Sequence, residues 1–181
     1  MRVIAGTLRG RRLVAPEGQA TRPTSDRARE SLFNLLGPIR AGTRVLDLYA
    51  GSGALGIEAL SRGAAFAQFV ERARPAIAAI RRNVEALGLS DRALILAVDA
   101  RSDAAFDGGP FDLVLADPPW PDRRDEEIVE RAERALAPGG ILVLEHPAAR
   151  PAPGAPTGRE LWKSRKYGDT ALSLYRSSPD A

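Results

Sequence analysis

Short apolar runs alternate with helical patterns over most of this chain, and this alternation limits the possible folds more than any other feature. The strands are predicted at Arg44–Tyr49, Ala67–Val70, Ala93–Val98, Phe111–Ala116 and Ile141–His146. The helices between them are predicted to end near Arg62, Leu87 and Leu136. Apolar strands separated by helices form parallel sheets that are covered on both faces. The sequence therefore predicts a Rossmann-like α/β domain.

Two smaller segments flank this alternation. Before it, the runs Arg2–Ala5 and Arg12–Ala15 predict a hairpin, and the N-cap candidates Thr24, Ser25 and Asp26 predict a helix that ends near Leu36. After it, Pro138-Gly139-Gly140 predicts a turn, and Glu160–Lys166 with Thr170–Arg176 predict a terminal hairpin. We therefore expect a basic N-terminal extension over residues 1–42, packed on a main domain over residues 43–181.

Positive charge lies at both ends of the 181 residues. Residues 1–30 contain seven arginines against three acidic side chains, and residues 159–176 contain five basic side chains against two acidic ones. The residues between these two segments carry a small negative net charge. Clustered arginine is typical of proteins that bind a phosphate backbone. Arg9, Arg11, Arg12 and Arg22 are the arginines that we expect to contact nucleic acid.

Several classes of site are excluded or disfavoured by composition. The chain has no cysteine, which excludes disulfides, a thiol nucleophile and a cysteine-ligated zinc. Its one histidine, His146, precedes a proline at a predicted strand end and is expected to be structural. The acidic run Asp125–Glu133 is predicted to be the solvated face of a helix, so no metal site is expected. The chain shows neither a membrane-length apolar run nor a signal peptide, and we expect a cytoplasmic protein.

A glycine-rich loop follows the first long strand. Gly51, Gly53 and Gly56 fit the pattern G-x-G-x-x-G, which on its own suggests a dinucleotide site. Asp47, at the end of the strand, argues against that ligand because a carboxylate repels a pyrophosphate. It attracts the sulfonium and ammonium groups of S-adenosylmethionine. We therefore predict a loop, with Tyr49 and Ser52 beside its glycines, that binds S-adenosylmethionine.

Acidic residues also end the next two strands. Glu71 is predicted to accept hydrogen bonds from the two ribose hydroxyls of a nucleoside cofactor. Asp99 is predicted to accept one from the adenine amino group, while the backbone of Ala100 contacts the ring. These positions indicate a nucleoside, and Glu71 fits NAD as well as S-adenosylmethionine.

The sequence Asp117-Pro118-Pro119-Trp120 follows the fourth strand. Neither proline has a backbone N–H, so the carbonyl groups face the site without competing donors. The Asp117 carboxylate and the Pro118 carbonyl can together accept both hydrogens of an amino group on a planar ring. Trp120 offers a face on which an unstacked base can stack. This turn therefore predicts transfer of a group to an exocyclic amine.

These motifs resemble the class I S-adenosylmethionine-dependent methyltransferases that act on amino groups. The N-terminal motifs resemble more narrowly the bacterial 16S rRNA guanine-N2 methyltransferase family. They are Met1–Gly6, Arg9-Gly10-Arg11, Arg22-Pro23-Thr24 with the helix that follows, and the loop Ala50–Gly63. The resemblance implies a mainly parallel seven-stranded sheet, a monomer, and 16S rRNA as the substrate, either as naked RNA or within the small ribosomal subunit. Thr24 and the N-terminal arginines are then expected to contact RNA.

Two departures and three alternatives accompany this resemblance. Trp120 stands where the family more often has Phe or Tyr, and Asp117 stands where adenine methylases usually have Asn. A methyltransferase for DNA or for another RNA would share every cofactor residue. An NAD-dependent oxidoreductase fits the glycines but neither Asp47 nor the proline turn. An RNA-binding domain without activity would not need Asp117.

Overall fold

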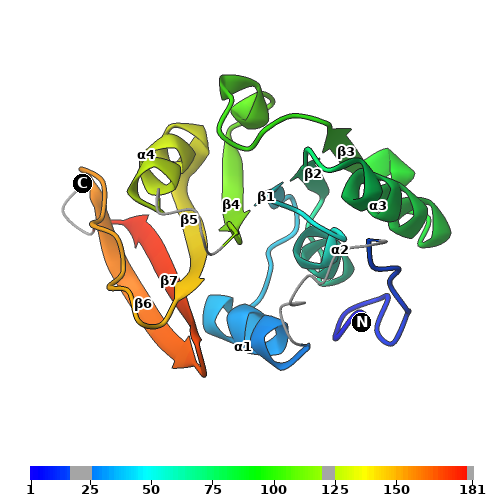
Figure 1. Cartoon of the computed structure of the whole chain (residues 1–181), viewed down its shortest axis with the longest axis horizontal. Helices are drawn as coiled ribbons and strands as arrows, with labels where there is room; N and C mark the ends of the chain where they lie inside the picture. The colour runs from blue at the N-terminus through cyan, green and yellow to red at the C-terminus, as the bar shows by residue number, and fades with distance from the viewer. Residues whose placement is uncertain (17–25, 120–124, 179–181) are drawn as a thin grey trace.

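The computed structural model describes residues 1–16, 26–119 and 125–178. Within them, one seven-stranded sheet has the order β3-β2-β1-β4-β5-β7-β6. The strands are β1 Arg44–Leu48, β2 Phe66–Val70, β3 Ala93–Leu96, β4 Phe111–Ala116, β5 Leu136–Pro147, β6 Arg159–Tyr167 and β7 Thr170–Ser177. The first five are parallel, and β7 runs antiparallel to both β5 and β6 (Figure 1). The predicted mainly parallel seven-stranded sheet is confirmed.

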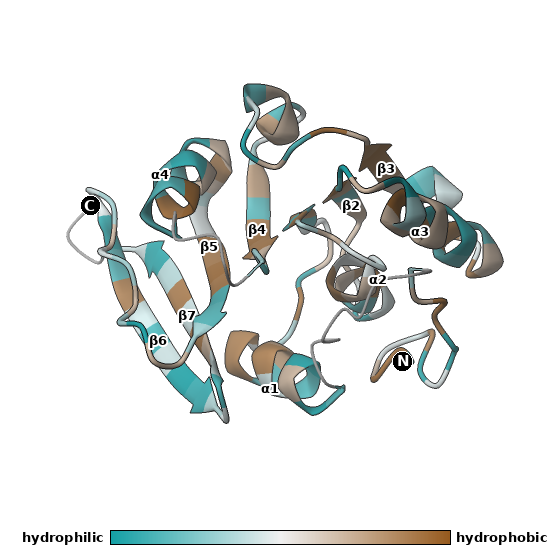
Figure 2. Cartoon of the chain, in the orientation of Figure 1, coloured by the Kyte–Doolittle hydropathy of each residue, from teal (hydrophilic) through white to brown (hydrophobic). Residues whose placement is uncertain are grey.

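Helices cover both faces of the sheet, as predicted. They are α1 Asp26–Leu36, α2 Ala54–Ser61, α3 Arg74–Ala86 and α4 Asp125–Ala135, with short 3₁₀ helices at Ser90–Arg92 and Asp103–Phe106. One buried cluster joins α1, α2 and α3 to the sheet, and a second joins α4 to the opposite face. Successive residues of β1 belong to different clusters, because Val45 is buried in the first cluster and Leu46 in the second. The central strands and the helix faces toward them are correspondingly hydrophobic (Figure 2).

The N-terminal extension forms the predicted hairpin in a minimal form. Arg2 and Arg12 make an isolated antiparallel bridge, and the Val3 amide donates to the Arg11 carbonyl at 2.9 Å. Val3 and Leu13 are buried in the same cluster as α2 and α3. This hairpin therefore packs on the main domain through the domain's own core.

Two parts of the chain differ from the predictions. The predicted turn Pro138–Gly140 lies inside β5, whose pairing with β4 shifts register between Phe111 and Leu113. A bulge of this kind accommodates extra residues without ending the strand. Asp125, predicted to be solvated, is buried and pairs with Arg150 at 3.1 Å. An arginine from the loop after β5 covers that helix terminus, which sequence periodicity cannot show.

His146 has the predicted structural role. It is buried, and its Nε2 lies 2.9 Å from the Ser173 hydroxyl on β7. Burial lowers the pKa of His146, which favours the neutral imidazole. In the part of the chain that the structure describes, no helix is long and apolar enough to cross a membrane.

Candidate functional site

Four acidic residues lie at the carboxyl ends of four adjacent strands. Asp47 is in β1, while Glu71, Asp99 and Asp117 follow β2, β3 and β4. The sheet order places these strands side by side as β3-β2-β1-β4. The chain turns outward in both directions from β1, and ligands of open α/β sheets bind at such a switch point. The structure thus brings the predicted acidic residues to one edge.

Asp47 is the buried centre of this group. Its Oδ2 accepts a hydrogen bond from the Gly56 amide at 2.8 Å, which satisfies a donor in the first turn of α2. Burial raises the pKa of Asp47 well above its usual value, against the effect of the Gly56 bond. The carboxylates of Asp117 and Glu71 raise the pKa further. A cation among these three groups is therefore favoured, and an anion is disfavoured.

The glycine loop has a backbone that few other residues can adopt. Gly51 and Gly53 have positive φ angles of 57° and 78°, and Tyr49 has a φ of 59°. A positive φ at a non-glycine residue is strained and is often found at functional sites. A Cβ on Gly56 would lie 2.4 Å from Cε1 of Phe69, so α2 packs on β2 only with glycine there. The loop is therefore held in one shape close to the switch point.

Glu71 connects this loop to α3. Its Oε2 accepts the Gly51 amide at 3.0 Å, and its Oε1 accepts the amides of Arg72 and Ala73 at 2.8 and 2.9 Å. A carboxylate oxygen has two lone pairs, so Oε2 can accept one further hydrogen bond. Glu71 thus orients the loop and still has the capacity to accept a bond from a ligand hydroxyl.

Asp99 is held by two arginines that sequence reasoning missed. Arg72 Nη1 lies 2.8 Å from Oδ2, and Arg101 Nε lies 2.8 Å from Oδ1. The hydrogen bond from Arg101 holds the pKa of Asp99 well below its usual range. Ala100, between them, is buried. An adenine amino group at Asp99 would therefore share the carboxylate with the guanidinium groups.

The turn after β4 is described only in part. Asp117 is half-buried, Pro118 is buried and Pro119 is exposed. Asp117 is close enough to Asp47 to raise its pKa, so the predicted catalytic and cofactor residues share one electrostatic environment. Trp120 lies outside the described residues, as do Arg22 and Thr24.

Asn83 joins the N-terminal extension to the glycine loop. Its amide exchanges hydrogen bonds with Val14, accepting from the Val14 nitrogen at 2.7 Å and donating to the Val14 carbonyl at 3.0 Å. It also donates to the Ser52 carbonyl at 2.9 Å. Asn83 is 2% exposed, so these bonds are formed away from water. The sequence carried a signal for this residue, because a polar residue interrupts the apolar face of α3 between Ile80 and Val84.

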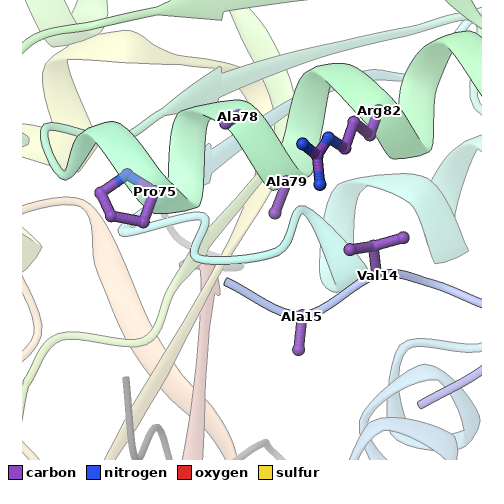
Figure 3. Close-up of a pocket in the computed structure, with 6 residues that line it drawn as sticks. All are labelled: Val14, Ala15, Pro75, Ala78, Ala79 and Arg82. Carbon is purple, nitrogen blue, oxygen red and sulfur yellow. The ribbon is translucent and has the colours of Figure 1, made fainter. Parts of the chain in front are cut away.

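The predicted RNA-contacting arginines in the described part are exposed. Arg9 and Arg12 are on the surface of the hairpin, and Arg11 is exposed while its Nη2 donates to the Ala86 carbonyl at 3.0 Å. A hollow of about 70 Å³ lies between the extension and α3, lined by Val14, Ala15, Pro75, Ala78, Ala79 and Arg82 (Figure 3). Ligand pockets are usually about 300–1,000 Å³. This hollow between the extension and α3 is therefore too small to hold a nucleoside cofactor.

Comparison with known proteins decides the family. A family model described as Conserved hypothetical protein 95 matches residues 1–176. The chain belongs to this family. A relative of the chain, ribosomal RNA small subunit methyltransferase D of Escherichia coli strain K12, is 36% identical over 178 residues, which cover 97% of this chain and 89% of that protein. The predicted family resemblance is thereby confirmed.

Solved structures extend this result to the fold. A structure from Escherichia coli described as a methyltransferase has a TM-score of 0.85 and 36% identity, and the match covers 98% of both chains. A more distant methyltransferase, complexed with SAH, has a TM-score of 0.67 at 16% identity and covers 83% of this chain and 48% of its own. That second likeness concerns the fold alone. The chain therefore has the same fold as a structure that is described as a methyltransferase.

Proposed function

We propose that the chain transfers a methyl group from S-adenosylmethionine to the N2 amino group of a guanine in 16S rRNA. The observation that carries this proposal is the juxtaposition of the Asp47 loop and the Asp117-Pro118 turn at one sheet edge. The full-length similarity to enzymes named as small-subunit rRNA methyltransferases supports both the reaction and the substrate.

The donor set fits S-adenosylmethionine. Asp47, Glu71 and Asp117 create an environment that favours the cationic sulfonium and ammonium groups. Gly51 and Gly53 let the backbone approach the ligand, Glu71 accepts ribose hydroxyls, and Asp99 with Ala100 faces the adenine. When bound, the cofactor supplies an electrophilic methyl group. The same acidic environment disfavours the pyrophosphate of NAD and argues against an oxidoreductase.

The residues after β4 hold the nucleophile. The guanine amino nitrogen has a delocalised lone pair and is a weak nucleophile. Asp117 and the Pro118 carbonyl accept hydrogen bonds from the two N–H groups of this amine. These bonds fix the nitrogen in line with the methyl group and stabilise the positive charge that develops on it. Trp120 would stack on the flipped base. The proton leaves the nitrogen after or during transfer, to Asp117 or to water.

We propose that the extension, residues 1–42, binds the RNA substrate and is functionally distinct from the main domain, residues 43–181. Arg9, Arg11 and Arg12, together with Arg22 and Thr24, are proposed to bind the RNA backbone. We further propose that the enzyme is monomeric and cytoplasmic, needs no metal, and acts on 16S rRNA either free or within the small subunit. A methyltransferase for another RNA or for DNA is the competing function.

Nucleoside mass spectrometry tests the reaction. Purified chain is incubated with labelled S-adenosylmethionine and, separately, naked 16S rRNA, small subunits and duplex DNA. Labelled N2-methylguanosine in either ribosomal substrate is the expected result, and it would locate the preferred substrate. Label in DNA alone would refute the proposed function.

Glu71→Ala is expected to weaken S-adenosylmethionine binding by about 1–3 kcal/mol, the range for a lost hydrogen bond to a charged group. The variant also removes the acceptor of the Gly51 amide, which donates to the Glu71 carboxylate in the unmodified chain. Calorimetry measures the affinity, with Glu85→Ala, an exposed glutamate on α3, as the control. Equal affinities in the two variants would remove Glu71 from the site.

Affinity for RNA is expected to fall steeply with salt if the extension contacts phosphates. Arg9→Gln should lower the slope of log affinity against log salt by about 0.7–0.9, because the neutral side chain no longer displaces a counterion from a phosphate. Arg9 is exposed, so the substitution leaves the core unchanged. Filter binding over a series of salt concentrations gives the slope. A slope equal to that of the unmodified protein would show that Arg9 does not bind a phosphate.

A further inference from the structure

The β6–β7 hairpin extends past the active-site edge of the sheet. Strand register aligns Ala116 of β4 with Leu144, Ser173 and Ser164 on the next three strands. β6 is antiparallel to β7, which is antiparallel to β5, so β6 runs in the same direction as β4. Asp117 is one residue beyond this row on β4. Arg165 and Lys166 are one and two residues beyond it on β6.

The distance across the sheet is short. Neighbouring strands are about 4.8 Å apart, so the three steps from β4 to β6 span about 14 Å. An RNA whose target base is held at Asp117 extends over more than this distance on both sides. The end of β6 therefore lies beside the path of any RNA that reaches the site.

Charge is distributed unequally along the hairpin. At the end far from the site, Arg159 pairs with Glu133, and Arg176 pairs with Glu160 at 2.7 Å. At the near end, Arg165 and Lys166 are exposed, and neither forms an ion pair within the described residues. Figure 2 shows this end of β6 as hydrophilic. The turn that follows β6 contains one exposed acidic residue, Asp169, so a net positive charge remains at the active-site edge.

Helix α1, which is part of the N-terminal extension, contacts both the β6–β7 hairpin and the first residues of the chain. At its last turn, the Leu35 carbonyl accepts a hydrogen bond from Lys163 Nζ at 2.7 Å. At its first turn, Arg29 donates to the Arg2 carbonyl. Trp162 packs on the core and lies against Lys163, 3.7 Å from Nζ to the ring centroid. The two basic segments are therefore fixed on either side of α1 (Figure 1).

We infer that Arg165 and Lys166 bind the RNA backbone at a second place, which holds the substrate from the side opposite the N-terminal arginines. This inference rests on the proposed function, because it names a further part of the same substrate site. The competing interpretation is that charges on an edge strand prevent pairing with a second copy of the chain. Under that interpretation, replacing Arg165 and Lys166 would leave RNA binding unchanged.

The test is the double variant Arg165→Gln/Lys166→Gln, compared with Arg40→Gln/Arg134→Gln. The control arginines are also exposed but lie next to the amino ends of β1 and β5, at the opposite edge. Filter binding with a 16S rRNA fragment should show a salt slope lower by about 0.7–0.9 for each phosphate that the variant no longer binds. KM for RNA should rise while kcat and the affinity for S-adenosylmethionine stay unchanged. The charge-retaining variant Arg165→Lys/Lys166→Arg should bind RNA as the unmodified chain does.

The outcomes separate the possibilities. An unchanged slope and KM in the double variant would overturn the inference, and self-association of that variant in size-exclusion chromatography would then assign the charges to edge protection. Failure of the proposed function has a different signature, because the unmodified chain would then not methylate rRNA at all. The salt slopes of the variants would still decide whether the hairpin touches RNA.

Discussion

Replacing Asp117 with alanine is expected to slow methyl transfer by about 10²–10³-fold, the usual cost of losing one positioned group at a reacting centre. Binding of S-adenosylmethionine should change far less than the rate, because the carboxylate is proposed to contact the target amine and to affect the cofactor only through the electrostatic environment that it shares with Asp47. Asp117 is half-buried and precedes the buried Pro118, so the substitution removes no core side chain. A split between rate and cofactor affinity is the expected signature of a residue that acts on the nucleophile.

Asp117→Asn separates positioning from charge. The amide oxygen still accepts one hydrogen bond, but the negative charge is lost. If charge stabilisation of the developing cation dominates, the asparagine variant should be nearly as slow as alanine. If positioning dominates, it should retain much more activity. Single-turnover transfer with labelled cofactor measures the rates of both variants. A rate in Asp117→Ala equal to that of the unmodified chain would refute the proposed active site.

Much of this site could be predicted from sequence because its signals are local. Asp47, Glu71, Asp99 and Asp117 each follow or end an apolar run, and parallel strands bring such ends to one edge. The glycine loop was predictable for the same reason, since its positive φ angles belong to residues close together in the chain. The positions of these residues could therefore be predicted from the order of the apolar runs along the chain.

The residues that sequence missed act over long separations in the chain. Asn83 bonds to residues 69 and 31 positions away, and Arg72 meets Asp99 27 positions away. Periodicity assigns a residue to a face of its own helix or strand, but it does not identify what covers that face. Asp125 was wrongly predicted to be solvated for the same reason, because its partner Arg150 is on another element.

Glu58 is the clearest case, because its partners come from three segments. Its carboxylate, fully buried on α2, accepts the amides of Ile4 and Ala5 at 2.8 and 3.0 Å and pairs with Arg62 at 2.7 Å. Arg29 of α1, also fully buried, has its Nε 3.8 Å from Oε2. This one side chain thus attaches the extension, and with it the proposed RNA-binding arginines, to the helix that follows the glycine loop.

Glu58→Ala is therefore expected to lower the free energy of unfolding by about 3–5 kcal/mol, the cost of removing one partner from a buried ion-pair network. The fully buried Arg29 would lose one of its two carboxylate partners and keep Asp26 at 3.0 Å, and two amides of the extension would lose their acceptor. Urea denaturation followed by circular dichroism measures the loss, with a check that the m-value is unchanged. The matched control is Glu126→Ala, an exposed glutamate on α4, for which a change within about 0.5 kcal/mol is expected.

Glu58→Gln tests the same role in a milder form. The amide is nearly isosteric and can still accept a hydrogen bond from one of the two extension amides, but it cannot neutralise Arg29. If the charge matters most, glutamine should destabilise almost as much as alanine; if the attachment of the extension matters most, it should be intermediate. Limited proteolysis distinguishes these cases, because loss of attachment exposes residues 1–16 to cleavage before the rest of the chain unfolds. Stability equal to that of the control in both variants would show that Arg29 is compensated by Asp26 and the Arg2 carbonyl alone.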